Sequence, residues 1–182
     1  MHYTAAAGQA NDVTITYKFR DDGSHSGLYD FTLDDRVPLT AGAGCAHPDR
    51  ADRTKVVCTV PPPGDSASDL EKLIADTGDG NDRITVDPGN NAYLTLHGGK
   101  GDDTLKANGY VTLRGDAGAD RTTGGGGAWG KDDIRGGRGD DKLYGDRSDD
   151  TVHGNSGNDL LRGGAGNDKL SGGPGRDDVR QN

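Results

Sequence analysis

The chain is poor in the residues from which a conventional hydrophobic core is built. Hydrophobic residues make up 30% of its 182 residues and aromatic residues 5%, whereas glycine occurs 32 times. Low hydrophobicity combined with a formal net charge of −9 is typical of chains that bury too little apolar surface to fold by themselves. An ordinary globular core is therefore not expected, although the length suffices for one domain or for one repeat array with a cap.

Basic residues and long apolar runs are scarce as well. Lysine and arginine number 21 against 30 aspartate and glutamate residues, so the basic patches that a nucleic-acid-binding protein needs are not indicated. No apolar run approaches the roughly 20 residues that cross a bilayer, and no signal peptide is recognisable. We therefore expect no nucleic-acid partner and no membrane insertion, whereas the acidic balance favours cationic partners, metal ions included.

Cysteine occurs only twice, at Cys45 and Cys58. The pair brackets the polar stretch CAHPDRADRTKVVC, which predicts a disulfide and an oxidising compartment. In the chain-entropy account such a short loop contributes about 3 kcal/mol. Two reduced cysteines are the alternative, and zinc held by Cys45, His47 and Cys58 is disfavoured because no fourth ligand lies at finger spacing.

No arrangement of residues indicates catalysis. The five histidines are scattered, and Ser66 and Ser68 have no paired base nearby in the sequence. The glycine-rich strings lack the Gly-Lys-Ser/Thr ending of a phosphate-binding loop and recur too often to be one. We therefore expect a protein that is not an enzyme.

A nine-residue repeat runs through the second half of the chain. Six consecutive units begin at Gly127 and read GAWGKDDIR, GGRGDDKLY, GDRSDDTVH, GNSGNDLLR, GGAGNDKLS and GGPGRDDVR. Each unit opens with glycine and has an aliphatic residue in the eighth place. The sixth place is always aspartate, at Asp132, Asp141, Asp150, Asp159, Asp168 and Asp177. Further copies at 77–85, 98–106 and 115–123 carry Asp82, Asp103 and Asp120 in that place.

Each unit predicts a turn followed by a short strand. Places one to four are glycine-rich, which permits a tight turn with part of its backbone at positive φ. Where the second glycine is replaced, Asp116, Asp146 and Asn155 tolerate this conformation best, whereas Ala128 and Ser148 predict distorted turns. The aliphatic residue faces inward, and because one unit buries nothing alone, the units must stack.

Stacking brings the aspartates together. If one coil uses two nonapeptides, turns recur on each edge every 18 residues, and parallel strands lie about 4.8 Å apart. Neighbouring carboxylates then repel by about 0.9 kcal/mol in water and about 3.5 kcal/mol at an effective dielectric constant of 20, more than the roughly 0.2–1 kcal/mol gained from a stacked pair. A divalent cation between them reverses the sign. Oxygen-only ligands on flexible turns favour calcium over magnesium and softer metals.

The unit resembles GGxGxDxUx, the nonapeptide of the RTX (repeat-in-toxin) family, over about residues 77–180. The resemblance implies an all-β fold, a right-handed parallel β-roll (a β-solenoid), that folds on binding several Ca²⁺ ions. It further implies that each ion lies between stacked turns. The ligands would be the sixth-place aspartates, backbone carbonyls from places one and three of one turn, and carbonyls from places two and four of the other.

Carried onto this chain, the resemblance implies two columns of metal ligands. One edge stacks the turns of Asp82, Asp103, Asp120, Asp141, Asp159 and Asp177, and the other stacks those of Asp132, Asp150 and Asp168. The most regular carbonyl sets are Gly136, Gly137, Arg138 and Gly139; Gly154, Asn155, Ser156 and Gly157; and Gly163, Gly164, Ala165 and Gly166. The stretch ANGYVTLR looks like a coil half without a metal turn. The extra glycines before Gly127 are expected to disturb the site between Asp120 and Asp141.

The N-terminal third differs in composition, and three parts are predicted: an N-terminal β cap over 1–72, degenerate and interrupted coils over 73–126, and a regular β-roll over 127–182. VTITYKFR and LYDFTLDD alternate apolar and polar residues and predict a β-hairpin, and TKVVCTV predicts a further strand. Leu73 and Ile74 fit a strand of the first coil, with a short helix as the alternative. In GQANDVTIT, Asp12 matches Asp82 if this is a worn first unit; an ordinary turn is equally compatible.

These features together predict a secreted, extracellular calcium-binding protein with a structural role or a role in contacts with a surface or matrix. The alternative is a calcium-dependent accessory or targeting module of a larger secreted enzyme or toxin; a disordered linker is a third reading. The sequence departs from RTX proteases in lacking His-Glu-x-x-His. No long repeat-free segment follows the last unit, so a cleaved N-terminal signal is expected. An extracellular partner and end-to-end self-association through 172–180 are further expectations.

Overall fold

The computed structural model describes residues 2–5, 8–20, 28–38, 45–49, 51–52, 54–60, 73–86, 93–125 and 130–182. All regular structure within these residues is β-strand, so the predicted all-β class is confirmed. The same residues contain no helix that is long and apolar enough to cross a membrane.

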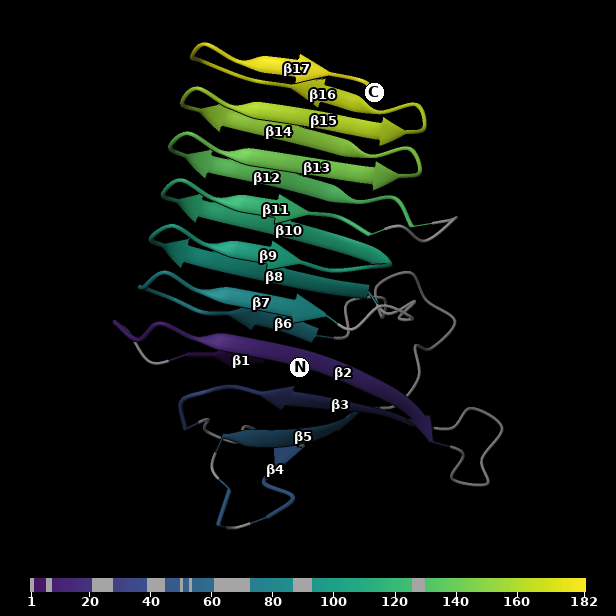
Figure 1. Cartoon of the computed structure of the whole chain (residues 1–182). Helices are drawn as coiled ribbons and strands as arrows, with labels where there is room; N and C mark the ends of the chain where they lie inside the picture. The colour runs from purple at the N-terminus through teal and green to yellow at the C-terminus, as the bar shows by residue number, and fades with distance from the viewer. Residues whose placement is uncertain are drawn as a thin grey trace.

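The strands form two sheets that face each other across the core of a parallel β-solenoid (Figure 1). In order, the first sheet contains β1 (His2–Thr4), β6 (Leu73–Asp76), β8 (Tyr93–Lys100), β10 (Tyr110–Ala117), β12 (Asp133–Arg138), β14 (Thr151–Ser156) and β16 (Lys169–Ser171). The second begins with β17 (Asp178–Arg180), β15 (Leu160–Ala165), β13 (Lys142–Arg147), β11 (Arg121–Thr123), β9 (Thr104–Lys106), β7 (Arg83–Val86) and β2 (Asp12–Arg20). From β6 onward, consecutive strands alternate between the sheets, as the repeat predicted.

Two buried ladders run through the whole core and take one residue per coil from each sheet; the early coils bury a second residue beside them, such as Leu73, Leu94 and Val111 in the first sheet. The ladder of the first sheet contains Ala75, Leu96, Leu113, Ile134 and Val152. That of the second contains Val13, Ile84, Leu105, Thr122, Leu143 and Leu161. Each fully buried aliphatic side chain contributes about 1.5–3 kcal/mol, so the core of one coil is small. Thr122, in an aliphatic place, buries a hydroxyl that has no hydrogen-bond partner among the described residues.

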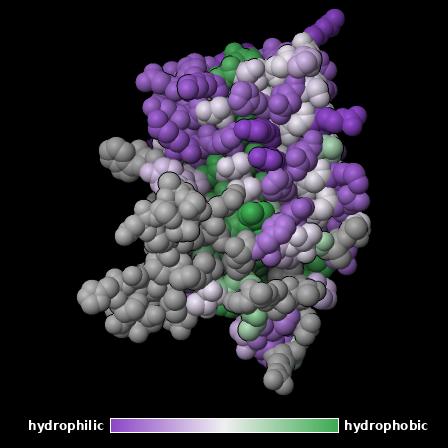
Figure 2. Space-filling model, turned by 180° about the vertical axis from the view of Figure 1, so that it is seen from behind, coloured by the Kyte–Doolittle hydropathy of each residue, from purple (hydrophilic) through white to green (hydrophobic). Residues whose placement is uncertain are grey.

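Polar side chains cover much of the outer surface. The face in Figure 2 is largely hydrophilic over the described coils, with hydrophobic residues visible between the polar ones. Among the described large hydrophobic residues only Val179 is exposed, at 42%. Val179 continues the inward ladder of the second sheet, but β17 is an edge strand, so no further described strand covers it. The final unit, over 172–180, therefore exposes one large aliphatic side chain.

The N-terminal residues build both the first coil and an antiparallel extension. β1 pairs in parallel with β6, and β2 pairs in parallel with β7, so the first coil comes from within residues 1–72. Beyond β2 the second sheet continues antiparallel through β3 (Leu28–Asp34), β5 (Lys55–Val60) and β4 (Cys45–Ala46). The predicted hairpin and the strand in TKVVCTV are therefore confirmed. The strand reading of Leu73 and Ile74 is confirmed as well, in β6.

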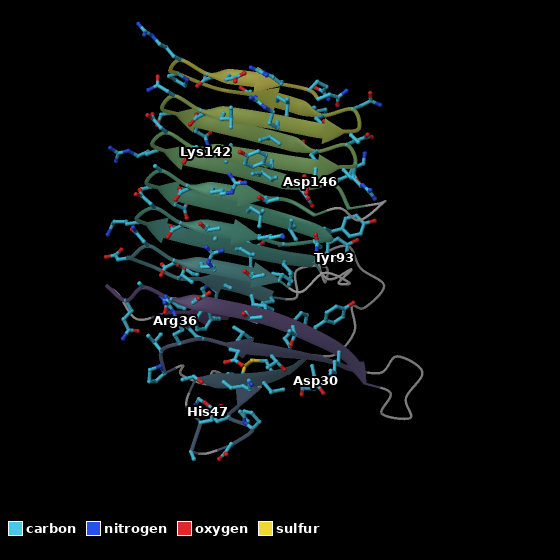
Figure 3. The ribbon with its side chains drawn as sticks, in the orientation of Figure 1. Asp30, Arg36, His47, Tyr93, Lys142 and Asp146 are labelled. Atoms are coloured by element: carbon cyan, nitrogen blue, oxygen red, sulfur yellow. A yellow bond between two sulfur atoms is a disulfide. The ribbon has the colours of Figure 1, made fainter. Side chains whose placement is uncertain are left out.

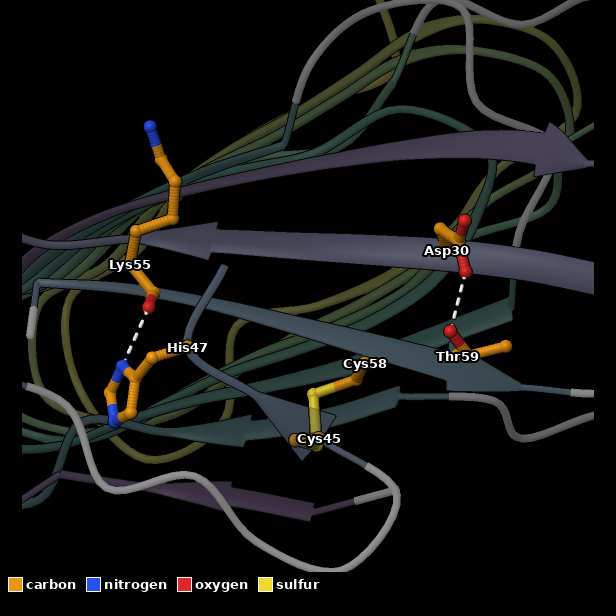
Figure 4. The surroundings of a disulfide bond; sticks show 6 residues. All are labelled: Asp30, Cys45, His47, Lys55, Cys58 and Thr59. Carbon is orange, nitrogen blue, oxygen red and sulfur yellow. Dashed lines mark hydrogen bonds between the residues drawn. A yellow bond between two sulfur atoms is a disulfide. The ribbon is translucent and has the colours of Figure 1, made fainter. Parts of the chain in front are cut away.

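The predicted disulfide joins Cys45 on β4 to Cys58 on β5, where the two residues are direct cross-strand partners (Figure 4). Close by, Nδ1 of His47 lies 2.8 Å from the Lys55 carbonyl oxygen, and the Thr59 hydroxyl donates to Asp30 at 2.6 Å. Both cysteine sulfurs are used in the disulfide, so Cys45 and Cys58 are not zinc ligands in this structure.

The register assigned to the first turn was wrong by one residue. Asp12 pairs with Arg83, and Asn11 occupies the place that Asp82 holds in the next coil. The physical reason is strand alternation: Val13 packs inward opposite Ile84, so the residue two places before it, Asn11, also points inward. The first turn therefore carries a neutral amide in the sixth place.

Candidate metal centre

The sixth-place aspartates lie in the turns on the two edges of the solenoid. The first edge, on the left in Figure 1, is made by the turns that run from the first sheet to the second, such as β12 to β13. It holds Asp82, Asp103, Asp120, Asp141, Asp159 and Asp177. The opposite edge holds Asp132, Asp150 and Asp168. The structure thus brings together all nine predicted aspartates in the two predicted columns.

Within each column, one carboxylate oxygen is bound to the preceding coil. Oδ1 of Asp159 accepts the backbone N–H of Asp141 at 2.9 Å, and Oδ1 of Asp141 accepts that of Asp120 at 2.8 Å. The same bond recurs between the other neighbours, at 2.8–3.0 Å on the first edge and 2.9 Å on the second. The Asp120–Asp141 pair is therefore as regular as the others, so the predicted disturbance by the preceding glycines is not found there.

The other carboxylate oxygen is buried and has no donor. Oδ2 lacks a hydrogen-bond partner among the described residues in six of the aspartates: Asp82, Asp103, Asp120, Asp141, Asp150 and Asp159. An unpaired buried carboxylate oxygen is costly, because burial removes water without replacing it. Burial accordingly raises the pKa of Asp141 to about 7, and the carboxylates of Asp120 and Asp159 add to the effect. Burial likewise raises the pKa of Asp150 to about 7 and that of Asp132 to about 8.

The first-place glycines leave the space beside these oxygens open. A Cβ on Gly136 would overlap the Asp141 carboxylate and lie 2.8 Å from the carbonyl oxygen of Gly154 on the next coil. The same overlap with the carboxylate of the own turn occurs at Gly98, Gly115, Gly154, Gly163 and Gly172. Glycine is therefore required here because oxygen atoms from two coils converge where a side chain would stand.

Backbone carbonyls line the rest of each inter-coil space. The second-place Gly137 faces the Asp116 carbonyl, and the fourth-place Gly139 faces the Gly118 carbonyl, both from the preceding coil. The third-place carbonyl of Ser156 accepts the N–H of Gly139 at 2.8 Å. Equivalent approaches recur at Gly157, Gly164 and Gly166, and the third-place carbonyls of Arg138 and Ala165 accept equivalent N–H groups. Carbonyls of places two and four therefore point toward the next coil, and the first-place carbonyl points back.

This donor set fits calcium. Its ligands are oxygen atoms alone, from carboxylates and flexible turn carbonyls, which is the chemistry that Ca²⁺ accepts with about six to eight ligands. No group of three His, Cys, Asp or Glu side chains converges among the described residues. Two carboxylates per space together with carbonyls account for this, because carbonyls supply the remaining oxygens.

The residues in register with the second column are apolar in the early coils and carboxylates in the later coils. Parallel register aligns Leu73, Leu94 and Val111 with Asp132, which precedes Asp150. The early coils thus bury apolar residues where the later coils have carboxylates. The prediction that ANGYVTLR lacks a metal turn is confirmed, because Val111 takes the aspartate's place. Asp132 begins the acidic part, and its Oδ2 accepts the Gly125 N–H at 2.9 Å.

The backbone of the turns follows the predicted conformations. Asp116, Asp146 and Asn155 have φ of 75°, 76° and 75°, as predicted, and Ser148 has φ of 87°. These are the residues that replace glycine, and all lie in the left-handed region. The Ser148 N–H donates to the Ala165 carbonyl at 2.8 Å, as at the equivalent Gly139, so the distortion predicted for this turn is not found. Figure 3 places Lys142 and Asp146 toward the two ends of β13, so that β13 joins the two edges. Ala128 lies outside the described residues.

Two contributions to the turns escaped the sequence reasoning. Asp140 is exposed, and its Oδ1 accepts the Asn158 N–H of the next coil at 2.7 Å. Asp102 and Asp149 bind the fifth residue of the next turn in the same way, so the fifth place forms a second ladder. Thr77, in the first place of its turn, donates its hydroxyl to the Gly98 carbonyl at 3.0 Å. In the later turns that the structure describes, a glycine stands in this place, at Gly98, Gly115, Gly136, Gly145, Gly154, Gly163 and Gly172.

Fold and turns together define a β-solenoid whose stacked turns form oxygen-lined sites suited to calcium. The family model of the RTX calcium-binding nonapeptide repeat matches residues 74–93, 95–109, 107–128, 127–161 and 153–180. The chain belongs to this family, whose repeats bind calcium. No curated protein and no solved structure matches the chain significantly.

Proposed function

We propose that this protein is a secreted, non-catalytic calcium-binding β-roll, which assembles when Ca²⁺ ions enter the spaces between stacked turns. Its role would be structural, or it would present a surface to an extracellular protein or matrix. The observation that carries the proposal is the row of buried Oδ2 atoms without a donor, each beside a space lined by carbonyl oxygens.

The energetics support dependence on calcium. From β12 onward each coil buries one aliphatic residue per sheet, while its aspartates stand about 4.8 Å from those of the next coil. Repulsion of about 3.5 kcal/mol per neighbouring pair, at an effective dielectric constant of 20, exceeds what one buried aliphatic side chain contributes. A doubly charged cation between two carboxylates converts this repulsion into attraction, and metal binding then supplies folding free energy.

The ions would be held between successive aspartates of each column. On the first edge the central space would use Asp141 and Asp159, with carbonyls from Gly137 and Gly139 below and Gly154 and Ser156 above. On the second edge Asp150 and Asp168 would bind with carbonyls from the turn of Gly163–Gly166. Asp177 has one neighbour in its column and is proposed as the weakest ligand.

The disulfide supports an extracellular location. The Cys45–Cys58 bond would persist in an oxidising compartment, and calcium is plentiful outside the cell, where even weak sites are filled. Folding would then be delayed until export. No described cluster of residues suggests a reaction, which is why we assign the chain a binding role.

Calcium titration followed by calorimetry and far-UV circular dichroism tests the proposal. We expect several ions per chain and a gain of β signal that a chelator reverses, whereas magnesium at the same concentration gives little change. A chain that keeps its full β signal in chelator, or that binds no calcium, would refute the proposal.

A further inference from the structure

A side chain of the protein, that of Asn11, occupies the space between the first and second turns of the first column. Asn11 occupies the sixth place of the first turn and is fully buried. Its backbone N–H donates to Oδ1 of Asp82 at 2.6 Å, in the same way that Asp141 donates to Asp159. The side chain at this place is therefore a carboxamide in a column that otherwise consists of carboxylates.

The Asn11 amide nitrogen is surrounded by acceptors from both coils. It donates to the Gln9 carbonyl at 3.1 Å, to the Thr77 carbonyl at 3.2 Å and to Oδ1 of Asp82 at 3.1 Å. With the group reversed, an amide oxygen would face three oxygen acceptors, so the nitrogen must take this position. The two amide hydrogens are thus shared among three oxygen atoms.

These three oxygens are the counterparts of the calcium ligands in the regular coils. Gln9 is the fourth residue of its turn, because the Gly80 α-carbon faces its carbonyl as Gly101 faces that of Gly80. Thr77 is the first residue of the next turn, and Asp82 is its sixth. A fourth-place carbonyl, a first-place carbonyl and an aspartate are the groups that surround each inter-coil space farther along.

A second carboxamide lies at the other end of the described array. Nε2 of Gln181 donates to Oδ2 of Asp168 at 2.9 Å and to the fourth-place carbonyl of Gly166 at 3.4 Å. Asp168 is accordingly absent from the set of aspartates with an unpaired Oδ2. A side-chain amide therefore meets the first column at its start and the second column at its end, whereas among the described residues no side-chain amide reaches the unpaired Oδ2 atoms of the carboxylates between.

We infer that the carboxamide of Asn11 takes the place of a calcium ion, so that the first coil joins the second without metal. This inference rests on the proposed function. A neutral donor pairs with the Gln9 and Thr77 carbonyls and with Oδ1 of Asp82, and it adds no charge. Oδ1 of Asn11 and Oδ2 of Asp82 have no partner among the described residues. The first coil, the antiparallel strands and the disulfide then form a calcium-independent base, on which the calcium-dependent coils assemble.

Asn11→Asp is the sharpest variant, because it restores the sixth-place carboxylate in an otherwise complete space. We expect one additional Ca²⁺ per chain by calorimetry, and a lower melting temperature in chelator. Asn167→Asp is the matched control, since it adds the same charge at an exposed fifth place. Its calcium count should equal that of the wild type. A folded Asn11→Asp protein with an unchanged count would overturn the inference.

Hydrogen exchange on the wild-type protein decides the question independently of any variant. The Arg83 N–H donates to the Asn11 carbonyl at 2.9 Å, and the Leu160 N–H donates to the Asp141 carbonyl at 2.8 Å, as equivalent bonds between coils. In chelator we expect Arg83 to remain protected and Leu160 to exchange. Loss of protection at both Arg83 and Leu160 overturns the inference. Protection of Leu160 in chelator contradicts the proposed function instead, so the two failures are distinguishable.

Discussion

Asp141→Asn removes one carboxylate from the middle of the first column and changes little else. Oδ1 of residue 141 accepts the Asp120 N–H, and an asparagine oxygen keeps that bond. The amide nitrogen replaces the Oδ2 that has no donor, close to the carbonyl of Gly154. The variant thus reproduces inside the column the arrangement that Asn11 has at its beginning.

Asp141→Asn should have two opposite effects: it raises the stability of the metal-free fold and lowers the affinity for calcium. A carboxyl whose pKa rises from 3.8 to about 7 on folding opposes the metal-free fold by about 4 kcal/mol above pH 7. Asp141→Asn removes that penalty and should stabilise the chain in chelator by up to this amount. The loss of a buried charged ligand should cost about 2 kcal/mol or more at each of the two spaces it borders, or roughly 30-fold in calcium affinity.

Calorimetry with calcium and thermal unfolding in chelator measure the two effects separately. Asp140→Asn is the control, since it makes the same charge change one residue away and keeps the acceptor for the Asn158 N–H. It should leave both quantities nearly unchanged. Wild-type calcium affinity in Asp141→Asn, or equal damage from both variants, would refute the assignment of Asp141 as a shared ligand.

Four further predictions concern pH, the core, a glycine and the disulfide. Because burial raises the carboxyl pKa values, to about 8 for Asp132, the metal-free fold is most stable below pH 3.8 and loses that stability as pH rises through about 6 to 8. Circular dichroism in chelator should therefore gain β signal on acidification, whereas calorimetry should find weaker calcium binding as protons compete. Thr122→Val should raise the free energy of unfolding by about 1–3 kcal/mol, since it removes a buried hydroxyl without a partner; an unchanged denaturant midpoint would argue against this. Gly136→Ala should eliminate calcium binding beside Asp141, because the new Cβ overlaps the carboxylate, and a full ion count by calorimetry would contradict it. Cys58→Ser should destabilise the N-terminal strands by about 3 kcal/mol in chelator; equal melting temperatures would show that the disulfide contributes little.

Much of the site followed from the nonapeptide because its contacts are repeated. A turn of glycines, a sixth-place aspartate and an eighth-place aliphatic residue recur together, so a single register places all of them. The positive φ of Asp146 and Asn155 was likewise predictable, since only a few residue types tolerate the conformation in which glycine is replaced.

Where the repeat is degenerate, the local sequence pattern predicted the wrong register. Alignment by residue type placed Asp12 in the column, although the inward packing of Val13 puts Asn11 there. Asp140 is exposed, yet its Oδ1 accepts a backbone N–H from the next coil. Both features concern partners on another coil, which are invisible in a single nine-residue unit.

The sequence by itself determined the repeating unit, the all-β class, the columns of aspartates and the pairing of the two cysteines, because each depends on residue type at short, regular spacing. Only the tertiary structure decided that Leu73 and Leu94 precede Val111 in register with the second column of aspartates. It alone decided that the Asn11 amide meets the carbonyl of Thr77 and the carboxylate of Asp82. These contacts join residues 66 and 71 apart in the chain, and the folding of the first coil, rather than any periodicity, brings them together.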